Sequence, residues 1–232
     1  MSALSTDVVA ERLDQVRARI ARAGAAPGRV RIVAVTKGFG PAAVEAAVGA
    51  GVVDLGENYA NELLEKAQSA PTAVRWHFLG ELQRNKLARL APHVHLWHGL
   101  ADEAQAQALA DRRPAAAVLV QVKLNGEERR HGADPSRVPA LVGHAAAAGL
   151  DVRGLMTVGP RAGGRDHIRS CFRRVAGLAR ELGLAELSMG MSGDFELAVE
   201  EGATIVRLGR ALFGERPRSS FAQIPRGGVQ PG

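Results

Sequence analysis

The sequence has a single cysteine, few aromatic side chains and no long apolar run. With Cys171 alone, an internal disulfide and a multi-cysteine metal site are excluded. A run of about 18 apolar residues, which a transmembrane helix needs, is absent. The N-terminal segment also lacks the apolar core of a secretory signal peptide. We therefore expect a cytoplasmic protein with no membrane anchor and no metal.

A dense block of lysine and arginine interleaved with aromatic residues is also absent, although the formal net charge is +6. The arginines are instead spread along segments of helical periodicity. Dedicated nucleic-acid-binding proteins gather basic side chains in one patch or stripe. The composition therefore disfavours a dedicated nucleic-acid-binding function, whose affinity would fall steeply with salt.

Short apolar runs alternate with helical segments along most of the chain. Residues 5–24 predict a leading amphipathic helix, because apolar side chains recur every three or four positions. Eight strand-then-helix units follow, with strands predicted at residues 31–35, 52–58, 75–80, 94–98, 116–124, 151–158, 185–189 and 204–209. This pattern predicts an α/β fold, a single (β/α)8 TIM barrel over residues 1–215 with an extra N-terminal helix. An open doubly wound sheet is the alternative, because alternation does not establish closure.

Two further segments have a simple interpretation. Residues 216–232 are rich in proline, glycine, serine and arginine and show no periodicity, which predicts a disordered tail. Cys171 stands at helical spacing with Val175 and Leu178. We therefore expect it to be a small buried hydrophobic residue and not a nucleophile.

Two glycine-rich turns lie close together near the end of the predicted barrel. SMGMSGD (188–194) and RLGR (207–210) each follow a short apolar run and precede a segment that can start a helix. Unpaired backbone N–H groups at such turns favour anions. The two turns together predict a cup for a phosphate group.

Lys37 ends the first predicted strand, and in a barrel the chemistry gathers at the C-terminal ends of the strands. Partial burial lowers the pKa of a lysine, and a neutral amine can attack an aldehyde to form a Schiff base. A lysine for an aldehyde and a cup for a phosphate together describe a site for pyridoxal 5′-phosphate (PLP). A solvated lysine at a strand end is the alternative.

Arg207 lies in the last predicted strand, two residues before Gly209. An arginine cannot give up its proton, so it donates to an unprotonated ring nitrogen and weakens electron withdrawal by the ring. A surface ion pair with Glu200 or Glu201 is the alternative. The apolar surroundings of Arg207 in the sequence favour the functional interpretation.

Six motifs resemble the pyridoxal phosphate homeostasis protein family and occur in its order. They are VAVTK (33–37), LGENYANE (55–62), WHFLGELQRNK (76–86), GLMTV (154–158), LSMGMSGDFELAVEEG (187–202) and TIVRLGRALFG (204–214). They span most of residues 30–214, and the third and fifth in combination are highly specific. The resemblance implies a fold-type III barrel, similar to the N-terminal domain of alanine racemase, with PLP at the C-terminal face of the strands.

The resemblance also implies roles for individual residues. Lys37 matches the family's Schiff-base lysine, and Arg207 matches the arginine that faces the pyridine nitrogen. Ser192 matches the phosphate cup, as do Gly209 and Arg210 through their backbone N–H groups.

Asn58, His77 and Met189 match positions that line the cofactor. A core histidine is the alternative for His77. Because side chains alternate along a strand, Trp76 and Phe78 point away from the face of His77, and we expect them to pack against helices.

The sequence departs from the family pattern in two loops. The stretch TKGFGP (36–41) is richer in glycine than is usual after the lysine, and Arg130 stands where many members have lysine. Asn85 and Lys86 can attract an anion, either a second PLP or a partner, although a solvated helix start is the simpler interpretation.

We expect a PLP-binding protein that buffers or delivers the cofactor, with PLP-dependent apo-enzymes as partners and no catalytic residue of its own. A slow racemase-like enzyme is the alternative. A racemase of this fold takes a second base from an additional domain, which is not expected in 232 residues, and the only tyrosine, Tyr59, is not an obvious base. The absence of an added domain also favours a monomer.

Overall fold

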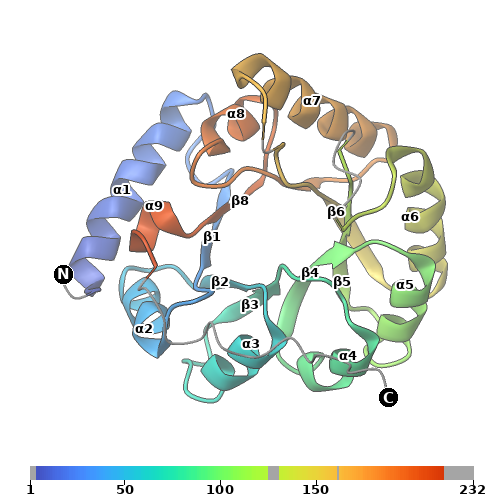
Figure 1. The fold of residues 1–232 in the computed structure, drawn as a ribbon, viewed down its shortest axis with the longest axis horizontal. Coiled ribbons are helices and arrows are strands. Elements are labelled where there is room, and N and C mark those ends of the chain that lie inside the picture. The colour runs from blue at the N-terminus through green and yellow to red at the C-terminus, as the bar shows by residue number, and fades with distance from the viewer. Residues whose placement is uncertain (1–3, 125–130, 161, 217–232) are drawn as a thin grey trace, which may run out of the picture.

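Parallel strands close into a ring in the order β1-β2-β3-β4-β5-β6-β7-β8 (Figure 1). The computed structural model describes residues 4–124, 131–160 and 162–216. The strands are β1 (Arg31–Val35), β2 (Asp54–Glu57), β3 (Arg75–Phe78), β4 (Val94–Leu100), β5 (Ala117–Gln121), β6 (Asp151–Met156), β7 (Glu186–Ser188) and β8 (Ile205–Leu208). The ring closes where β1 pairs with β8, with Val33 opposite Arg207. The predicted barrel is therefore confirmed, and the open sheet is excluded.

Helices surround the ring of strands, as Figure 1 shows. They are α1 (Thr6–Arg22), α2 (Pro41–Gly49), α3 (Ala60–Ala67), α4 (Arg84–Leu90), α5 (Glu103–Ala110), α6 (Val138–Ala147), α7 (Arg165–Glu181), α8 (Phe195–Glu200) and α9 (Arg210–Phe213). The leading helix α1 contacts α2, α8 and α9 on the outside of the barrel. It begins after Ser5, whose hydroxyl accepts a hydrogen bond from the backbone N–H of Val8 and so caps the helix.

The strands bury apolar residues on both faces, as expected of a parallel sheet under helices. Side chains on the outer face pack against the helices, and Trp76 and Phe78 belong to this large cluster, as predicted. A smaller apolar cluster belongs to the inner face of the strands and comprises Val33, Leu96, Ala117, Leu119, Met156 and Ile205. The barrel is therefore filled with side chains and is not a pore.

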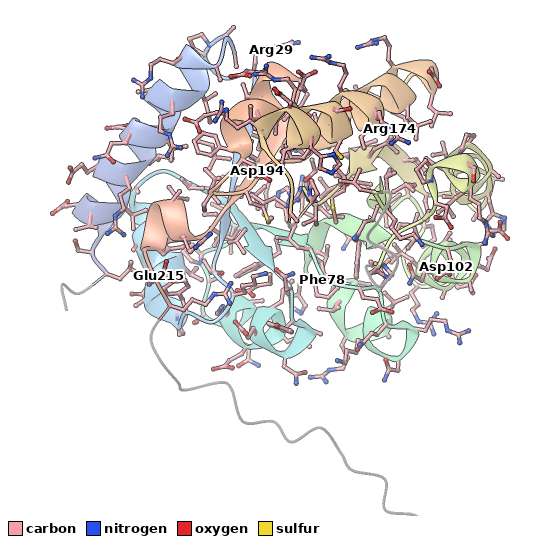
Figure 2. All side chains as sticks on the ribbon, turned by 45° about the horizontal axis from the view of Figure 1, so that its top comes forward. Arg29, Phe78, Asp102, Arg174, Asp194 and Glu215 are labelled. Carbon is pink, nitrogen blue, oxygen red and sulfur yellow. The ribbon has the colours of Figure 1, made fainter. Side chains whose placement is uncertain are left out.

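The remaining predictions concern the surface and the ends of the chain. Cys171 is a buried free thiol, as predicted. The predicted disordered tail lies outside the described residues, apart from Arg216. In the described ranges, no helix combines the length and the apolar character that crossing a membrane requires. Figure 2 shows charged side chains on the periphery of the molecule, among them Arg29, Arg174 and Glu215.

Candidate functional site

A cavity of about 470 Å³ opens where the strands end. Its wall includes residues that follow or end β2, β3, β5, β6 and β7, among them Asn58, Gly80, Gln121, Met156, Met191 and Asp194. The side-chain oxygen of Asn58 is buried and has no hydrogen-bond partner in the described part of the chain. Leaving a buried acceptor unpaired costs about 1–3 kcal/mol. This oxygen is therefore suited to a donor that a ligand brings.

Lys37 follows β1 and is half-buried at this end of the barrel. Burial lowers the pKa of its ammonium group, and the positive charges of Arg216 and Arg207 lower it further, whereas Glu57 and Glu62 oppose the shift. A lowered pKa increases the fraction of neutral amine, which is the nucleophilic form. The electrostatic influence of Arg207 reflects the pairing of β1 with β8.

A buried ion cluster fixes the backbone on both sides of Lys37. The Lys66 ammonium of α3 lies 2.5 Å from a Glu57 carboxylate oxygen and 3.0 Å from a Glu62 oxygen, and it donates to the Thr36 carbonyl at 2.9 Å. The Glu62 carboxylate also accepts from the backbone N–H of Gly38 at 2.8 Å. Lys66 and Glu57 are almost completely buried. Both glutamates belong to the LGENYANE motif, but their role is not evident from the sequence, because the burial of Lys66 between them arises only in the folded chain.

The two glycine-rich turns meet after β7 and β8, as the phosphate-cup prediction requires. The Ser192 hydroxyl accepts a hydrogen bond from the backbone N–H of Ala211 at 3.1 Å, which joins the turns. Among the described residues, no acceptor takes the backbone N–H groups of Ser192, Gly193, Gly209 and Arg210. The joined turns thus offer free N–H donors close to one hydroxyl, and such an arrangement suits an anion.

Arg207 is buried on the inner face of β8. One terminal nitrogen donates to the Ser188 carbonyl and hydroxyl oxygens, each at 2.7 Å, and the other donates to the Thr157 carbonyl at 2.7 Å. Its Nε–H has no acceptor in the described part of the chain, so this donor remains for a ligand. Burial lowers the pKa of Arg207 to about 10, although Asp194 opposes the shift, and the guanidinium stays charged at neutral pH.

The alternative interpretation of Arg207, a surface ion pair with Glu200 or Glu201, is wrong. Glu200 pairs with Arg169, and Glu201 pairs with Arg169 and Arg173. Those partners come from α7, on the outside of the barrel. Arg207 is turned the other way, because alternate residues of β8 face the interior.

His77 and Met189 are buried and are not on the wall of the cavity. Both nitrogens of His77 bond to protein, one to Asp54 and one to His98, so the structure favours the alternative of a core histidine. Met189 packs in the outer apolar cluster, and Met191 lines the cavity. Gly190, with φ of +93°, turns the chain between these methionines, and strand alternation does not extend across such a turn.

Of the predicted site residues, Asn58 belongs to the cavity wall, whereas Lys37, Ser192, Arg207, Gly209 and Arg210 lie at the ends of β1, β7 and β8 and are not part of that wall. The other positions that the sequence singled out also lie apart from the cavity. Tyr59 precedes α3 and is 61% exposed. Asn85 is exposed and Lys86 partly exposed on α4, as a solvated helix start requires. Arg130 lies outside the described residues.

Comparison with known proteins identifies the family of the chain. Residues 11–217 match the family model of the alanine racemase N-terminal domain. The chain is 46% identical to the pyridoxal phosphate homeostasis protein of Deinococcus radiodurans, over 85% of this chain and 95% of that protein. The chain belongs to the pyridoxal phosphate homeostasis protein family. The Pseudomonas aeruginosa protein of the same name is 40% identical, over 90% of this chain and 96% of its own length.

A solved structure extends the likeness from the sequence to the fold. The structure of PipY from Synechococcus elongatus with PLP bound has a TM-score of 0.80 and 32% sequence identity, and the match covers 89% of this chain and all of PipY. The family resemblance stated from the six motifs is therefore confirmed.

Proposed function

We propose that this protein binds PLP at the C-terminal ends of the strands and buffers or delivers it, without turnover of its own. The observation that carries the proposal is the arrangement of three groups at one end of the barrel. They are the half-buried Lys37, the joined turns of Ser192 and Gly209, and the free Nε–H of Arg207. PipY, whose structure contains PLP, supports the choice of ligand. When bound, PLP supplies an aldehyde and a ring that withdraws electrons.

The donor groups of the site suit the functional groups of PLP. Lys37 is the amine that would bind the aldehyde carbon, because its pKa is lowered. The Ser192 hydroxyl and the N–H groups of Gly209 and Arg210 would hold the phosphate. The Nε–H of Arg207 would donate to the ring nitrogen, and the unpaired oxygen of Asn58 would accept from the ligand. We assign His77 and Met189 to the buried layer that supports the site.

A carrier fits this site better than an enzyme. An arginine at the ring nitrogen holds its proton and limits electron withdrawal, which disfavours removal of a proton from a bound amino acid. In the described residues, the only tyrosine is exposed and is absent from the cavity wall. We further propose that the protein acts as a cytoplasmic monomer and passes PLP to PLP-dependent apo-enzymes. Light scattering, cell fractionation and reactivation of a purified apo-enzyme test these three points in turn.

Uptake of PLP can be tested by absorbance, borohydride reduction and peptide mapping. The wild-type protein should gain a visible absorbance band with PLP, and reduction should fix the ligand on Lys37 and not on Lys66. Lys37→Ala should lose the band. Lys123→Ala should keep it, because Lys123 follows β5 and pairs with Asp134, apart from the ends of β1, β7 and β8. A folded wild-type protein that takes up no PLP at saturation would refute the proposal.

A second candidate function, a slow amino-acid racemase, is favoured by the match to the alanine racemase N-terminal domain. It predicts deuterium exchange at Cα of an amino acid in heavy water, with many turnovers and full dependence on Lys37. The carrier proposal predicts no such turnover. The same purified samples decide between the two.

A further inference from the structure

The inner face of the barrel carries polar residues beside its apolar cluster. They come from five strands and are Asp54 of β2, His77 of β3, His98 of β4, Ser188 of β7 and Arg207 of β8. Each is nearly or completely buried. Buried polar groups are costly unless they are hydrogen-bonded. These five residues are hydrogen-bonded to one another in one continuous series, which we call the line.

Four hydrogen bonds join the line from end to end. Arg207 donates to the Ser188 hydroxyl at 2.7 Å, and that hydroxyl lies 2.9 Å from Nδ1 of His98. Nε2 of His98 lies 2.9 Å from Nδ1 of His77, and Nε2 of His77 lies 2.9 Å from a carboxylate oxygen of Asp54. The line ends at the Asp54–Arg75 ion pair, at the start of β2 and β3. It therefore runs from the N-terminal side of the strands to the guanidinium at the candidate site.

The two ends of the line restrict where its protons lie. Arg207 can only donate, and ionised Asp54 can only accept. Burial raises the pKa of Asp54, but the hydrogen bonds from His77 and Arg75 outweigh this effect and hold the pKa well below its usual range. With both histidines neutral, Ser188 donates to His98, His98 donates to His77, and His77 donates to Asp54. Both histidines then carry their proton on Nε2.

The reversed order requires a cationic His77. Only a doubly protonated His77 could donate both to Asp54 and to His98, which would in turn point its Nδ1–H at Ser188. Burial lowers the pKa of His77, although Asp54 opposes the shift, and it lowers the pKa of His98 well below its usual value. The neutral pair is therefore the favoured arrangement. In that arrangement every acceptor lone pair in the line faces toward Arg207.

We infer that Asp54, His77, His98 and Ser188 are positioning residues, an oriented hydrogen-bond chain that holds the Arg207 guanidinium in place for the ring nitrogen of the cofactor. Arg207 has no carboxylate at hydrogen-bond distance in the described residues. Its terminal nitrogens instead donate to the carbonyls of Ser188 and Thr157 and to the Ser188 hydroxyl. The hydrogen-bond chain keeps that hydroxyl oriented as an acceptor toward Arg207. With those nitrogens fixed, the Nε–H points in one direction. The part of this inference that concerns the cofactor rests on the proposed function.

The proton order can be tested on the protein without PLP. Nitrogen-15 NMR of the histidine rings distinguishes the two neutral tautomers from the cation, and His77→Gln and His98→Phe spectra assign the signals. We expect both rings to be neutral with the proton on Nε2. A cationic His77, or a proton on Nδ1 of His98, overturns the inference. This result does not depend on PLP, so a protein that binds no PLP refutes the proposed function and leaves the proton order decided.

The coupling to the site is tested by removing one link. Ser188→Ala deletes the hydroxyl but keeps the carbonyl that Arg207 also contacts. We expect the dissociation constant for PLP to rise about tenfold, equivalent to about 1.4 kcal/mol, and the absorbance band of bound PLP to shift.

A matched control is His95→Phe. His95 lies on β4 with His98 and touches the His77 ring edge-on, with ring centroids 5.9 Å apart. It makes no hydrogen bond to Asp54, His77, His98 or Ser188. The control should keep the wild-type dissociation constant and spectrum. A wild-type spectrum and affinity in Ser188→Ala overturn the inference, and so do equal losses in both variants. If Ser188→Ala does not fold, the tautomers of the wild-type histidines still decide the proposal.

Discussion

Replacing Lys66 by methionine should destabilise the protein more than the loss of any exposed charge. Lys66 is 4% exposed and Glu57 is completely buried, and their charged atoms lie 2.5 Å apart. In Lys66→Met the Glu57 carboxylate would keep, among the described residues, only the hydrogen bond from the Thr36 hydroxyl, at 2.6 Å. A buried charge without its partner is among the most costly defects in a protein interior.

The size of the effect follows from that geometry. Removing one member of a buried ion pair costs about 3–5 kcal/mol. For a domain of this size, 1 kcal/mol shifts the melting temperature by about 2–4 °C, so we expect a fall of roughly 6–20 °C. The control is Lys123→Met, because the Lys123–Asp134 pair reaches solvent, with side chains that are 22% and 57% exposed. Exposed pairs contribute about 0–1 kcal/mol, so this control should change the melting temperature little.

The pH dependence of the stability lost in Lys66→Met identifies the cause of that loss. Burial raises the pKa of Glu57, and Lys66 is the largest influence that opposes this shift, so the variant should raise the pKa further. A carboxyl group whose pKa is raised on folding favours the folded state below its unfolded pKa, and this contribution is lost as pH rises through the folded pKa. The gap between wild type and Lys66→Met should therefore be largest at neutral pH and should shrink as the pH falls toward 4.

Urea unfolding followed by circular dichroism measures the free energy of unfolding across this pH range. The double variant Glu57→Gln/Lys66→Met removes both charges. It should recover most of the lost stability, because no buried charge is left without a partner of opposite sign. A loss of less than about 1 kcal/mol in the single variant would refute the reasoning. A loss that does not change with pH would point to packing alone.

Other changes have equally definite outcomes. Gly190→Ala should lower the free energy of unfolding by about 1–3 kcal/mol, because its φ is +93° and a Cβ would lie 2.7 Å from the Ala198 side chain; an unchanged urea midpoint contradicts this. Asp54→Asn should be less stable than wild type at neutral pH, by an amount that shrinks in acid. The ionised Asp54 carboxylate stabilises the folded state above its unfolded pKa, because its pKa is lowered on folding, and this contribution is lost as the pH falls. A difference in stability that does not change with pH contradicts this. The Cys171 thiol should react slowly with a thiol reagent in the native protein and fully in urea, because it is buried and burial raises its pKa; rapid native labelling contradicts this.

The barrel is predictable from the sequence because each strand carries its own local signal. β1 was expected over the five residues that form it, and α1 shows the predicted buried face of Val9, Leu13, Val16 and Ile20. The predicted and observed ends of a strand disagree where the apolar run in the sequence is longer or shorter than the stretch of backbone that pairs with the neighbouring strands. β4 continues through Gly99 to Leu100, and β5 ends at Gln121 although the apolar run goes on to Leu124. A run of apolar residues indicates which residues are buried. The end of a strand is set instead by where its backbone hydrogen bonds to the neighbouring strands stop.

The site is only partly predictable, because its residues differ in what the sequence reveals about them. Lys37 and Arg207 stood out as charges at the end of, or within, apolar strands. The partners of Arg207 did not stand out, because Ser188 and His98 are 90 residues apart in the chain and meet only when the barrel closes. Lys66 was missed for a similar reason, since nothing in a helical segment marks one lysine as buried.

The polar chain in the barrel explains why the inner face departs from an apolar filling. Apolar side chains of similar volume in place of Asp54, His77 and His98 would be neutral or stabilising by the usual behaviour of buried charged groups. They would also leave the Ser188 hydroxyl free to rotate and to donate elsewhere, so that Arg207 would rest on the carbonyls of Ser188 and Thr157 alone. Two carbonyls fix the position of the guanidinium less firmly than three acceptors do. The interior is polar along the line that ends at Arg207, and it is apolar at Val33, Leu119 and Ile205, which fill the rest of the barrel.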